Sequence, residues 1–200
     1  MIRLDRVTAE TDDGTVIFEE LDLEARDGQV VIVTGHAGSG KSALIDVCRG
    51  VLVPVAGTVK VEPAGTCAVV TQEYELCESL TVAENIVLPL IARGVEHAQA
   101  AELTSKALQR FGIDAIADHL IDEISGGQRQ RVAVARAIAD GPTVIVADEP
   151  TSALDAENRE IVLAELRRCA DEGASVLITT NDTQLAENAD ASYVLGVAHV

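Results

Sequence analysis

The spacing of apolar and polar residues predicts strands near both ends of the chain. Apolar and polar residues alternate over Ile2–Thr8 and Val16–Leu23, as they do in strands with one buried face. Three runs are apolar almost throughout, at Val30–Thr34, Thr143–Ala147 and Ser175–Thr179. Such runs are typical of strands buried on both faces of a sheet. We therefore predict two half-exposed strands followed by three central ones.

Helical spacing of apolar residues dominates the middle of the chain. Helices are predicted from Lys41, from Thr81, over Glu96–Phe111, from near Gly126 to Ala139, over Asp155–Asp171 and, briefly, from Thr183, with short strands at Thr58–Val61 and Cys67–Thr71. Glu84 follows Thr81 at the spacing of a capping box, and Gly112 is placed to end the third helix. The alternation of strands and helices toward the C-terminus indicates a parallel sheet covered by helices. The middle helices are expected to form a lobe of their own.

Composition and charge narrow the interpretation. Hydrophobic residues make up 48% of the chain and aromatic residues only 2%, so the core must be aliphatic. The 15 basic and 33 acidic residues give a formal net charge of −18, which would repel nucleic-acid phosphates, so no nucleic-acid partner is expected. The four cysteines, Cys48, Cys67, Cys77 and Cys169, form no CxxC pair and are expected to be buried, reduced thiols.

A glycine-rich segment, "GHAGSGKS" at Gly35–Ser42, fits the pattern GxxxxGK[ST] between a buried strand and a helix. Glycines let backbone amides surround phosphate groups at the positive end of the helix dipole. Lys41 adds a positive charge toward the β- and γ-phosphates of a nucleotide, and the Ser42 hydroxyl is suited to Mg²⁺. The expected phosphate-binding residues are Gly35, Gly38, Ser39, Gly40, Lys41 and Ser42.

An acidic pair follows another buried strand, in "TVIVADEP" at Thr143–Pro150. The carboxylate of Asp148 would reach Mg²⁺, through water. Glu149 comes next, where it can polarise an attacking water molecule. An acidic pair after a strand is often only a solvated loop, but together with the phosphate loop it predicts the second half of a nucleotide site.

A third motif, "ISGGQRQRVAVARAIA" at Ile124–Ala139, opens a helix with Ser125 and two glycines. Free amides at a helix start favour an anion. One domain rarely needs two helix ends for one triphosphate, so a second copy of the chain, or a homologous one, could supply this end across an interface. The alternative interpretation is a simple helix cap with a basic face.

Together these motifs resemble the nucleotide-binding domain of an ABC ATPase, and the resemblance covers nearly the whole chain in order. It implies a head-to-tail dimer, a homodimer or heterodimer, with two ATP molecules at the interface. The signature residues Ser125, Gly126, Gly127 and Gln128 of one protomer would face the phosphate loop, Asp148 and Glu149 of the other. Gln72 matches the glutamine loop, which contacts Mg²⁺ and senses the membrane partner. Ser152–Asp155 matches the loop that crosses the dimer interface.

The resemblance implies an α/β P-loop fold with a mostly parallel core sheet, an N-terminal antiparallel part and a small helical subdomain. We expect one ABC ATPase domain over residues 1–200, with a helical subdomain at about 80–139 inserted in a core formed by 1–79 and 140–200. The stretch "TVAENIVLPLIARG", Thr81–Gly94, is similar to the branch that drives lipoprotein release and macrolide export. It favours a separate integral membrane permease as partner. No signal peptide opens the sequence and no apolar run approaches the roughly 18 residues of a membrane helix, so a cytoplasmic protein held at the inner face of the membrane is expected.

Three positions depart from the family pattern. Ala9–Thr15 lacks the aromatic residue that usually stacks on adenine, so base recognition should be weak or aliphatic. Ala43, in the nucleotide-binding loop region, replaces a usual threonine near the α-phosphate. Asn181, in "VLITTND", occupies the place of the switch histidine, which contacts the γ-phosphate and helps to hold the attacking water. Asparagine can donate a hydrogen bond but cannot carry a proton. We therefore expect ATP binding and dimerisation with reduced turnover.

Other functions compete with the transporter interpretation. A soluble ABC ATPase that assembles or remodels a complex would carry the same motifs. A DNA-repair or chromosome ATPase is disfavoured, because the segment from Gln72 to Ser125 is too short for a long coiled coil and the charge is acidic. An ATP-binding module with impaired turnover is the remaining alternative, and Asn181 is the residue that favours it.

Overall fold

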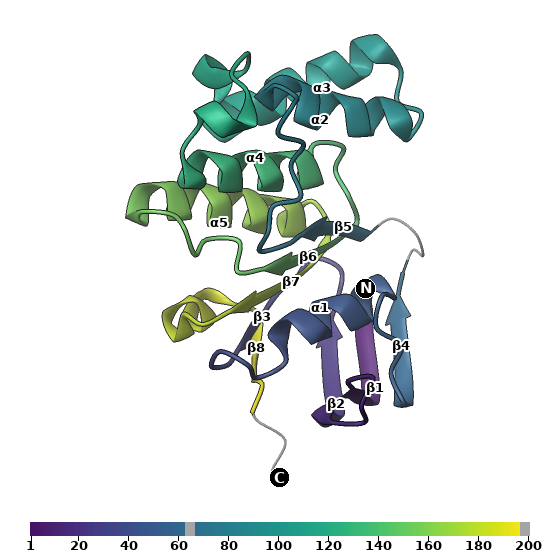
Figure 1. Ribbon diagram of the computed structural model, residues 1–200. Coiled ribbons are helices and arrows are strands. Elements are labelled where there is room, and N and C mark those ends of the chain that lie inside the picture. Colours follow the sequence, from purple (N-terminus) through teal and green to yellow (C-terminus); the bar gives the residue numbers. More distant parts are fainter. Residues whose placement is uncertain (63–66, 197–200) are drawn as a thin grey trace. The chain divides into compact units, whose positions relative to one another are not determined.

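The computed structural model describes residues 1–62 and 67–196, and its chain folds into two compact units (Figure 1). The first unit comprises Met1–Val69, Thr143–Glu149 and Arg167–Val200. The second comprises Val70–Pro142 and Pro150–Leu166. Neither unit is continuous in sequence, so each depends on contacts between segments that are far apart along the chain.

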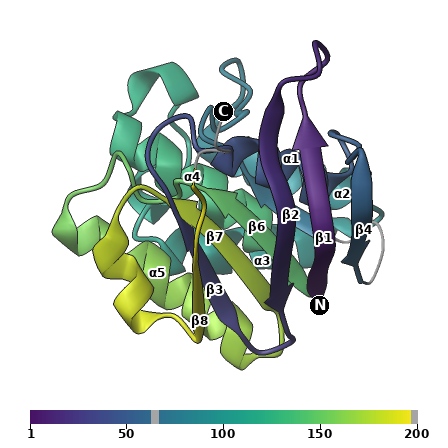
Figure 2. The same cartoon turned by 90° about the horizontal axis from the view of Figure 1, so that it is seen from below.

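An antiparallel sheet forms the N-terminal part of the first unit, with the strand order β2-β1-β4 (Figure 2). Its strands are β1 (Ile2–Glu10), β2 (Val16–Ala25) and β4 (Ala56–Val61). Alternate residues of β1 are buried, among them Ile2, Leu4, Val7 and Ala9. The alternation in the sequence therefore corresponds to one face packed on the core, as predicted.

The second sheet of this unit has five strands in the order β5-β6-β7-β3-β8. They are β5 (Cys67–Val70), β6 (Val144–Asp148), β7 (Ser175–Thr180), β3 (Val30–Thr34) and β8 (Ala191–Val194). Every residue of β3, β6 and β7 is buried, and these strands pair in parallel. Continuous apolar runs thus form the centre of the sheet.

Helix α1 (Lys41–Arg49) packs with both sheets in one hydrophobic core, which is aliphatic except for Phe18 and the partly buried Tyr193. Its buried members include Leu44, Ile45 and Val47, and they lie with residues of β1, β2, β3, β6 and β7. The helix ends at Gly50, which has a φ of 75° and whose amide bonds back to the carbonyls of Asp46 and Val47. This core fixes the start of α1 next to the end of β3.

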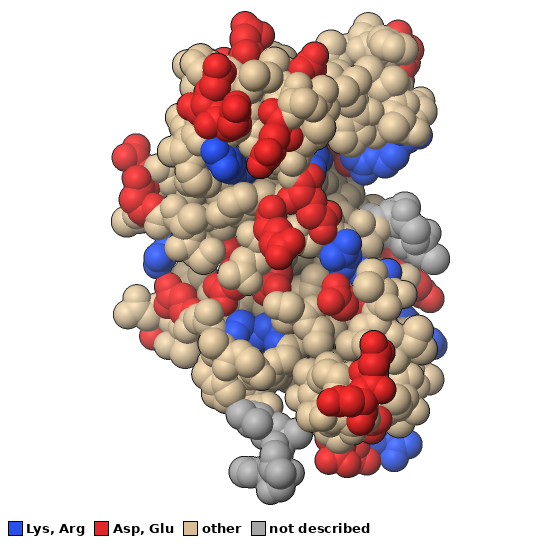
Figure 3. Space-filling view, in the orientation of Figure 1, with Lys and Arg blue, Asp and Glu red and all other residues tan. Residues whose placement is uncertain are grey.

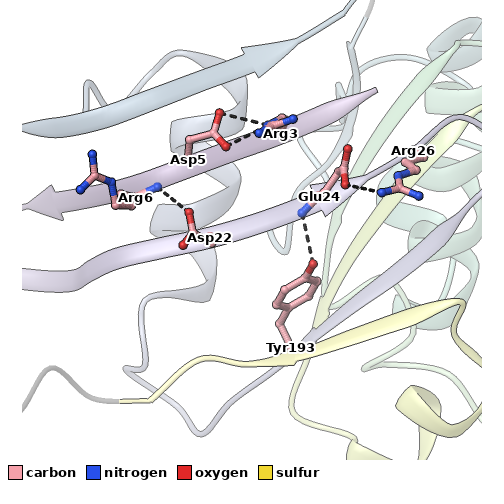
Figure 4. A network of polar contacts seen from close by, with 7 residues as sticks. All are labelled: Arg3, Asp5, Arg6, Asp22, Glu24, Arg26 and Tyr193. Atoms are coloured by element: carbon pink, nitrogen blue, oxygen red, sulfur yellow. Dashed lines mark hydrogen bonds and ion pairs between the residues drawn. The ribbon is translucent and has the colours of Figure 1, made fainter.

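Ion pairs and hydrogen bonds lie on the three-stranded sheet, and one hydrogen bond joins it to β8 (Figure 4). The Arg3 guanidinium pairs with Asp5 at 2.8 Å between Nε and Oδ1, and Arg26 pairs with Glu24 at 2.9 Å between Nη2 and Oε2. The amide of Glu24 donates to the hydroxyl of Tyr193 on β8, at 3.3 Å. Most of these groups are solvent-exposed, so each ion pair contributes little stability, about 0–1 kcal/mol.

The second unit is built on helices α2 (Val82–Ala92), α3 (His97–Arg110) and α4 (Gly126–Ile138), together with most of α5 (Ala156–Asp171). The predicted capping box opens α2: the amide of Glu84 donates to Thr81 Oγ1 at 3.2 Å, and the amide of Thr81 donates to Glu84 Oε2 at 2.8 Å. Gly112, with a φ of 58°, follows α3 at the predicted stop. Within residues 1–62 and 67–196, none of the helices has both the length and the apolar character needed to cross a lipid bilayer.

Most predicted elements are confirmed to within two residues, but some features differ. Strand β8 and the 3₁₀ turns at Asp114–Ile116 and Ile121–Glu123 were not predicted, because such short segments carry no clear period. The short helix from Thr183 is a 3₁₀ helix, Thr183–Asn188. The expected burial of all cysteines is wrong: Cys48 and Cys169 are buried, Cys67 is intermediate, and Cys77 is exposed because it lies in a surface loop.

Candidate functional site

The phosphate loop connects β3 to α1, and its backbone depends on glycine. Gly38 and Gly40 have φ values of 80° and 95°, in the left-handed region. Gly40 is the N-cap of α1 and provides no side-chain hydrogen bond to the helix start. Because glycine has no side chain, no N-cap side chain binds the amides of the first turn of α1. This arrangement suits an anionic ligand.

Gly35 and Ser39 form a tight contact inside this loop. A Cβ atom on Gly35 would lie 2.4 Å from Ser39 Oγ and 2.7 Å from the carbonyl oxygen of Leu195, so only glycine fits. Ser39 is 1% exposed, and its hydroxyl has no hydrogen-bond partner among the described residues. A buried hydroxyl without a partner is unfavourable unless a ligand completes its bonding. This observation fits a phosphate-bearing ligand in the loop.

Lys41 is buried, with 7% exposure, and its ammonium group makes three hydrogen bonds. Nζ donates to the carbonyl oxygen of Gly35 at 2.8 Å, to that of His36 at 3.0 Å and to Asn181 Oδ1 at 2.7 Å. All three acceptors are neutral, so the positive charge of Lys41 is not neutralised by its hydrogen-bond partners and acts on the nearby carboxyl of Glu149, whose pKa it lowers. Ser42 and Ala43 follow in the first turn of α1, where Ser42 is exposed and Ala43 half-buried.

The carboxylate of Asp148 is held at the end of β6 by the neighbouring strand. In the parallel register, Asp148 lies opposite Thr179 of β7. The Thr179 hydroxyl donates to Asp148 Oδ1 at 2.6 Å, and both residues are buried. This short charge-assisted bond fixes one carboxylate oxygen and leaves the other for a further interaction.

Glu149 follows directly, in a left-handed conformation with a φ of 49° that is uncommon outside glycine. Its amide donates to the carbonyl oxygen of Thr179 at 2.9 Å, and Oε2 accepts from the Thr180 hydroxyl at 3.2 Å. Burial raises the pKa of Glu149, while the hydrogen bond from Thr180 and the positive charge of Lys41 oppose that rise. A carboxylate with a raised pKa near a phosphate loop is suited to accept a proton.

Asn181 lies at the exposed end of β7, next to the same group of residues. Its side-chain oxygen is bonded to Lys41, and its backbone hydrogen bond to Glu149 lowers the pKa of that carboxyl. The first unit thus brings together the phosphate loop, the acidic pair and Asn181 at the carboxyl edge of β3, β6 and β7.

The predicted signature residues open α4 in the second unit. Ser125 and Gln128 form a reciprocal capping box: the Gln128 amide donates to Ser125 Oγ at 3.3 Å, and the Ser125 amide donates to Gln128 Oε1 at 2.8 Å. A Cβ atom on Gly127 would lie 3.3 Å from the carbonyl oxygen of Ala153, whereas Gly126 faces open space. Ser125 therefore does cap α4. The backbone amides of Gly126 and Gly127 lie at the start of the same helix.

Gln72 is exposed in the turn that follows β5, also in the second unit. Side chains of α4 and α2 form hydrogen bonds with the loop that follows Gln72, from Arg136 and Asn85 respectively. On α4, Arg136 donates from Nη1 to the carbonyl oxygen of Glu75 at 2.5 Å and from Nη2 to that of Tyr74 at 2.7 Å. Tyr74 and Glu75 have φ values of 61° and 48°, so their backbone is strained and these bonds help to maintain it.

Several positioning residues were not found by motif reasoning. Thr179 and Thr180 hold the acidic pair. Arg136 and the buried Asn85 hold the loop after Gln72. Gln130 Oε1 accepts a hydrogen bond from the amide of Ala153 at 2.9 Å. The threonines could have been found, because two hydroxyls end an apolar strand predicted to lie beside the acidic one. Arg136, Asn85 and Gln130 bond to backbone groups, which leave no trace in a sequence.

Fold and site together define a P-loop ATPase, with a phosphate loop and an acidic pair at one edge of a parallel sheet. The sequence profile described as ABC transporter matches residues 18–152. The chain belongs to the ABC transporter family and is an ABC-type ATPase. The family and the fold class predicted from the motifs are both confirmed.

Curated relatives agree with the macrolide-export resemblance. The macrolide export ATP-binding/permease protein MacB of Escherichia coli (strain K12) is 32% identical over 194 residues, covering 90% of this chain and 30% of that protein. MacB of Aggregatibacter actinomycetemcomitans is 31% identical over 203 residues, covering 94% of this chain and 32% of that protein. The chain thus spans about 30% of the length of these relatives.

Solved structures agree on the fold. An ATP-binding cassette in a dimeric post-hydrolysis state with ADP and Pi superposes with a TM-score of 0.89 at 27% identity, covering 100% of this chain and 97% of that one. A dimeric bacterial ABC transporter cassette superposes with a TM-score of 0.86, also at 27% identity and with the same coverage. Homologous cassettes therefore form dimers.

Proposed function

We propose that this chain is the ATP-binding subunit of an ABC transporter, which couples ATP binding and hydrolysis in a head-to-tail dimer to a separate membrane permease. The observation that carries the proposal is the joint placement of Lys41, Asp148 and Glu149 at one sheet edge. The names of the relatives, which include export and permease functions, support a membrane partner. Such a subunit would work at the inner face of the cell membrane.

ATP would bind with its phosphates in the loop Gly35–Ser42. The ammonium of Lys41 attracts the β- and γ-phosphates, and the unpartnered hydroxyl of Ser39 gains an acceptor. Backbone amides at the start of α1 add the positive end of its dipole. Ser125, Gly126, Gly127 and Gln128 of a second copy would complete the site from the other side.

Within the first unit, Mg²⁺ would be held by the oxygens of Ser42 and Asp148, ligands of the kind that this ion prefers. When bound, the ion neutralises charge on the phosphate oxygens. The hydrogen bond from Thr179 orients Asp148 for this role. Ser42 is exposed in the first turn of α1, so its hydroxyl is available to a ligand.

Glu149 would act as the general base toward the water that attacks the γ-phosphate. Its raised pKa makes it a stronger proton acceptor than a solvated carboxylate, and Thr180 keeps one oxygen in place. The proton would pass from the water to the carboxylate as the new bond to phosphorus forms, while the bond from the γ-phosphorus to the β–γ bridging oxygen breaks and ADP leaves.

The dimer is tested by the substitution Glu149→Gln, which removes the base and keeps the shape. Turnover should fall by at least about 100-fold, because general-base catalysis contributes roughly that much. On size-exclusion chromatography with ATP and Mg²⁺, the variant should elute as a dimer. Lys41→Ala should lose both nucleotide binding and the dimer. A strictly monomeric Glu149→Gln chain at high concentration, with ATP bound, would contradict the two-chain site.

The membrane partner is tested by purification of a tagged chain from detergent-solubilised membranes of the native host. We expect a protein with several membrane spans to be recovered in stoichiometric amount. Recovery of only soluble partners would contradict the transporter proposal and favour a remodelling complex. The Glu149→Gln chain serves as a matched sample, because a trapped dimer should retain the same partner.

We further propose that Asn181 limits turnover. Histidine in this place can hold the attacking water, whereas asparagine is shorter and cannot carry a proton. Asn181→His should raise the turnover of the purified chain by roughly tenfold to 100-fold, since lost positioning costs about that factor. An unchanged rate would show that the residue is not what limits hydrolysis.

A further inference from the structure

The hydrogen-bonding capacity of Lys41 is already full. An ammonium group has three N–H donors, and Nζ of Lys41 uses them on three oxygens at 2.7–3.0 Å. A phosphate oxygen can therefore receive a hydrogen bond from Lys41 only when one of these acceptors is released. Binding of a nucleotide must include an exchange at this atom.

The three acceptors are not equivalent. Those of Gly35 and His36 are backbone carbonyls of the phosphate loop itself, and their positions follow from the fold of that loop. The third is a side-chain oxygen of Asn181, an exposed residue at the end of β7, and a change in its side-chain torsions would release it without moving the backbone. Because lysine only donates, the atom that faces it must be the amide oxygen. Asn181 is consequently the acceptor whose release disturbs the loop least.

We propose that Asn181 is a positioning residue that competes with nucleotide for Lys41, and that nucleotide binds by exchanging the amide oxygen of Asn181 for a phosphate oxygen. This inference rests on the proposed ATP site and adds a competitor to it. The bond to Asn181, at 2.7 Å, is the shortest of the three and involves a charged donor. Asn181 therefore lowers the affinity of the chain for nucleotide.

Two substitutions should have opposite effects on nucleotide affinity. Asn181→Ala removes the competing acceptor and leaves one donor of Lys41 free, so a nucleotide no longer has to displace it. Asn181→Asp keeps an oxygen in nearly the same place and adds a negative charge, which strengthens the hold on Lys41. A residue that only contacts phosphate, or that only supports the fold, would weaken binding in the alanine variant as well.

The experiment is isothermal titration of each chain with ADP and with a non-hydrolysable ATP analogue, both with Mg²⁺ at low salt. We expect Asn181→Ala to bind nucleotide roughly tenfold more tightly than the native chain. Asn181→Asp should bind it at least roughly tenfold more weakly. Hydrogen bonds to charged groups are worth about that factor. Asn188→Asp is the matched control, since it adds the same charge at an exposed position on the 3₁₀ helix that follows β7. It should bind like the native chain.

The outcomes separate the two proposals. If the native chain binds no nucleotide, the proposed function itself fails. If it binds nucleotide but Asn181→Ala weakens or does not change the affinity, Asn181 does not compete for Lys41 and the inference is overturned. Asn181→Leu, which keeps the approximate shape of asparagine without its oxygen, should repeat the alanine result if that variant folds poorly. Melting temperatures identify any variant that does.

Discussion

At the scale of residues, two adjacent threonines on β7 hold two adjacent carboxylates at the end of β6. Thr179 donates to Asp148 and Thr180 donates to Glu149, at 2.6 and 3.2 Å between oxygen atoms. A donated hydrogen bond favours the ionised form of a carboxylate. The end of β7 therefore orients both carboxylates and lowers the pKa of Glu149.

The role of Thr180 can be tested through the pH dependence of turnover. Its hydrogen bond lowers the pKa of Glu149 against the rise that burial causes, so Thr180→Val should raise that pKa further. A general base must be ionised, so the acidic limb of the rate profile should move to higher pH. Thr183→Val, at an exposed threonine nearby, should leave the limb in place. A uniform drop in rate without any shift would point to a structural defect instead.

Base recognition is a second matter at this scale. The aromatic residue that usually stacks on adenine is missing, and Ile17 and Phe18 of β2 lie against Gly40 of the phosphate loop. Phe18 is buried, so the accessible surface at this point is aliphatic. Aliphatic contacts offer no hydrogen-bonding groups that distinguish adenine from guanine, so we expect ATP and GTP to bind with affinities within roughly tenfold of each other. A preference of 100-fold or more for ATP would show an adenine contact elsewhere. Competition titrations measure this ratio directly.

At the scale of elements, helices α2 and α4 hold the loop that contains Gln72. Arg136 of α4 bonds to two strained residues of the loop, and Asn85 of α2 bonds to the backbone of Cys77 at both its amide and its carbonyl group. Helix α4 also begins at the signature residue Ser125. A displacement of α4 would therefore change the support of the loop around Gln72 and the signature end together.

Asn85 allows the stability of this arrangement to be measured. The residue is 3% exposed, and its side chain makes hydrogen bonds of 2.8 Å from the Cys77 amide and 2.9 Å to the Thr81 carbonyl. Asn85→Leu keeps the size but leaves these groups unpaired, so the free energy of unfolding should fall by about 2–3 kcal/mol. Asn158→Ala, at a half-buried asparagine in the first turn of α5, should reduce it by less than about 1 kcal/mol. Urea unfolding curves followed by circular dichroism distinguish the two.

At the scale of the whole molecule, charge is the dominant property. The formal net charge is −18, and acidic side chains are spread over the whole face shown in Figure 3. Two copies of such a chain repel each other as they approach. Salt reduces this repulsion, because the screening length falls from about 10 Å at 0.1 M to about 3 Å at 1 M.

Dimer formation should accordingly depend on salt. The dissociation constant of the ATP-bound Glu149→Gln dimer should fall by roughly tenfold between about 0.1 and 1 M KCl, since like charges at an interface oppose binding by an amount of that order. Analytical ultracentrifugation measures the change, and choline chloride in place of KCl controls for a specific effect of potassium. A dimer that weakens with salt would instead indicate opposite charges facing each other across the interface.

The sequence was informative wherever local pattern and order along the chain decide the structure. Alternating and continuous apolar runs predicted the strands, and the order of motifs predicted the fold class. The bond between Lys41 and Asn181 was not predictable, because it joins residues 140 positions apart and depends on side-chain direction. The same holds for Arg136, whose partners are carbonyl groups that any residue would present. Contacts to the backbone carry no residue identity.

The parallel pairing of β6 with β7 has a consequence for how the chain folds. Val144–Ala147 lies opposite Ser175–Ile178, and apolar residues of similar size could slide past one another by two positions without leaving their face of the sheet. Such a slip would move Asp148 away from Thr179 and bury a carboxylate without its donor, a costly arrangement. The polar ends of these strands therefore favour the native register over shifted ones. Residues proposed to serve catalysis thus also help to align the strands of the core.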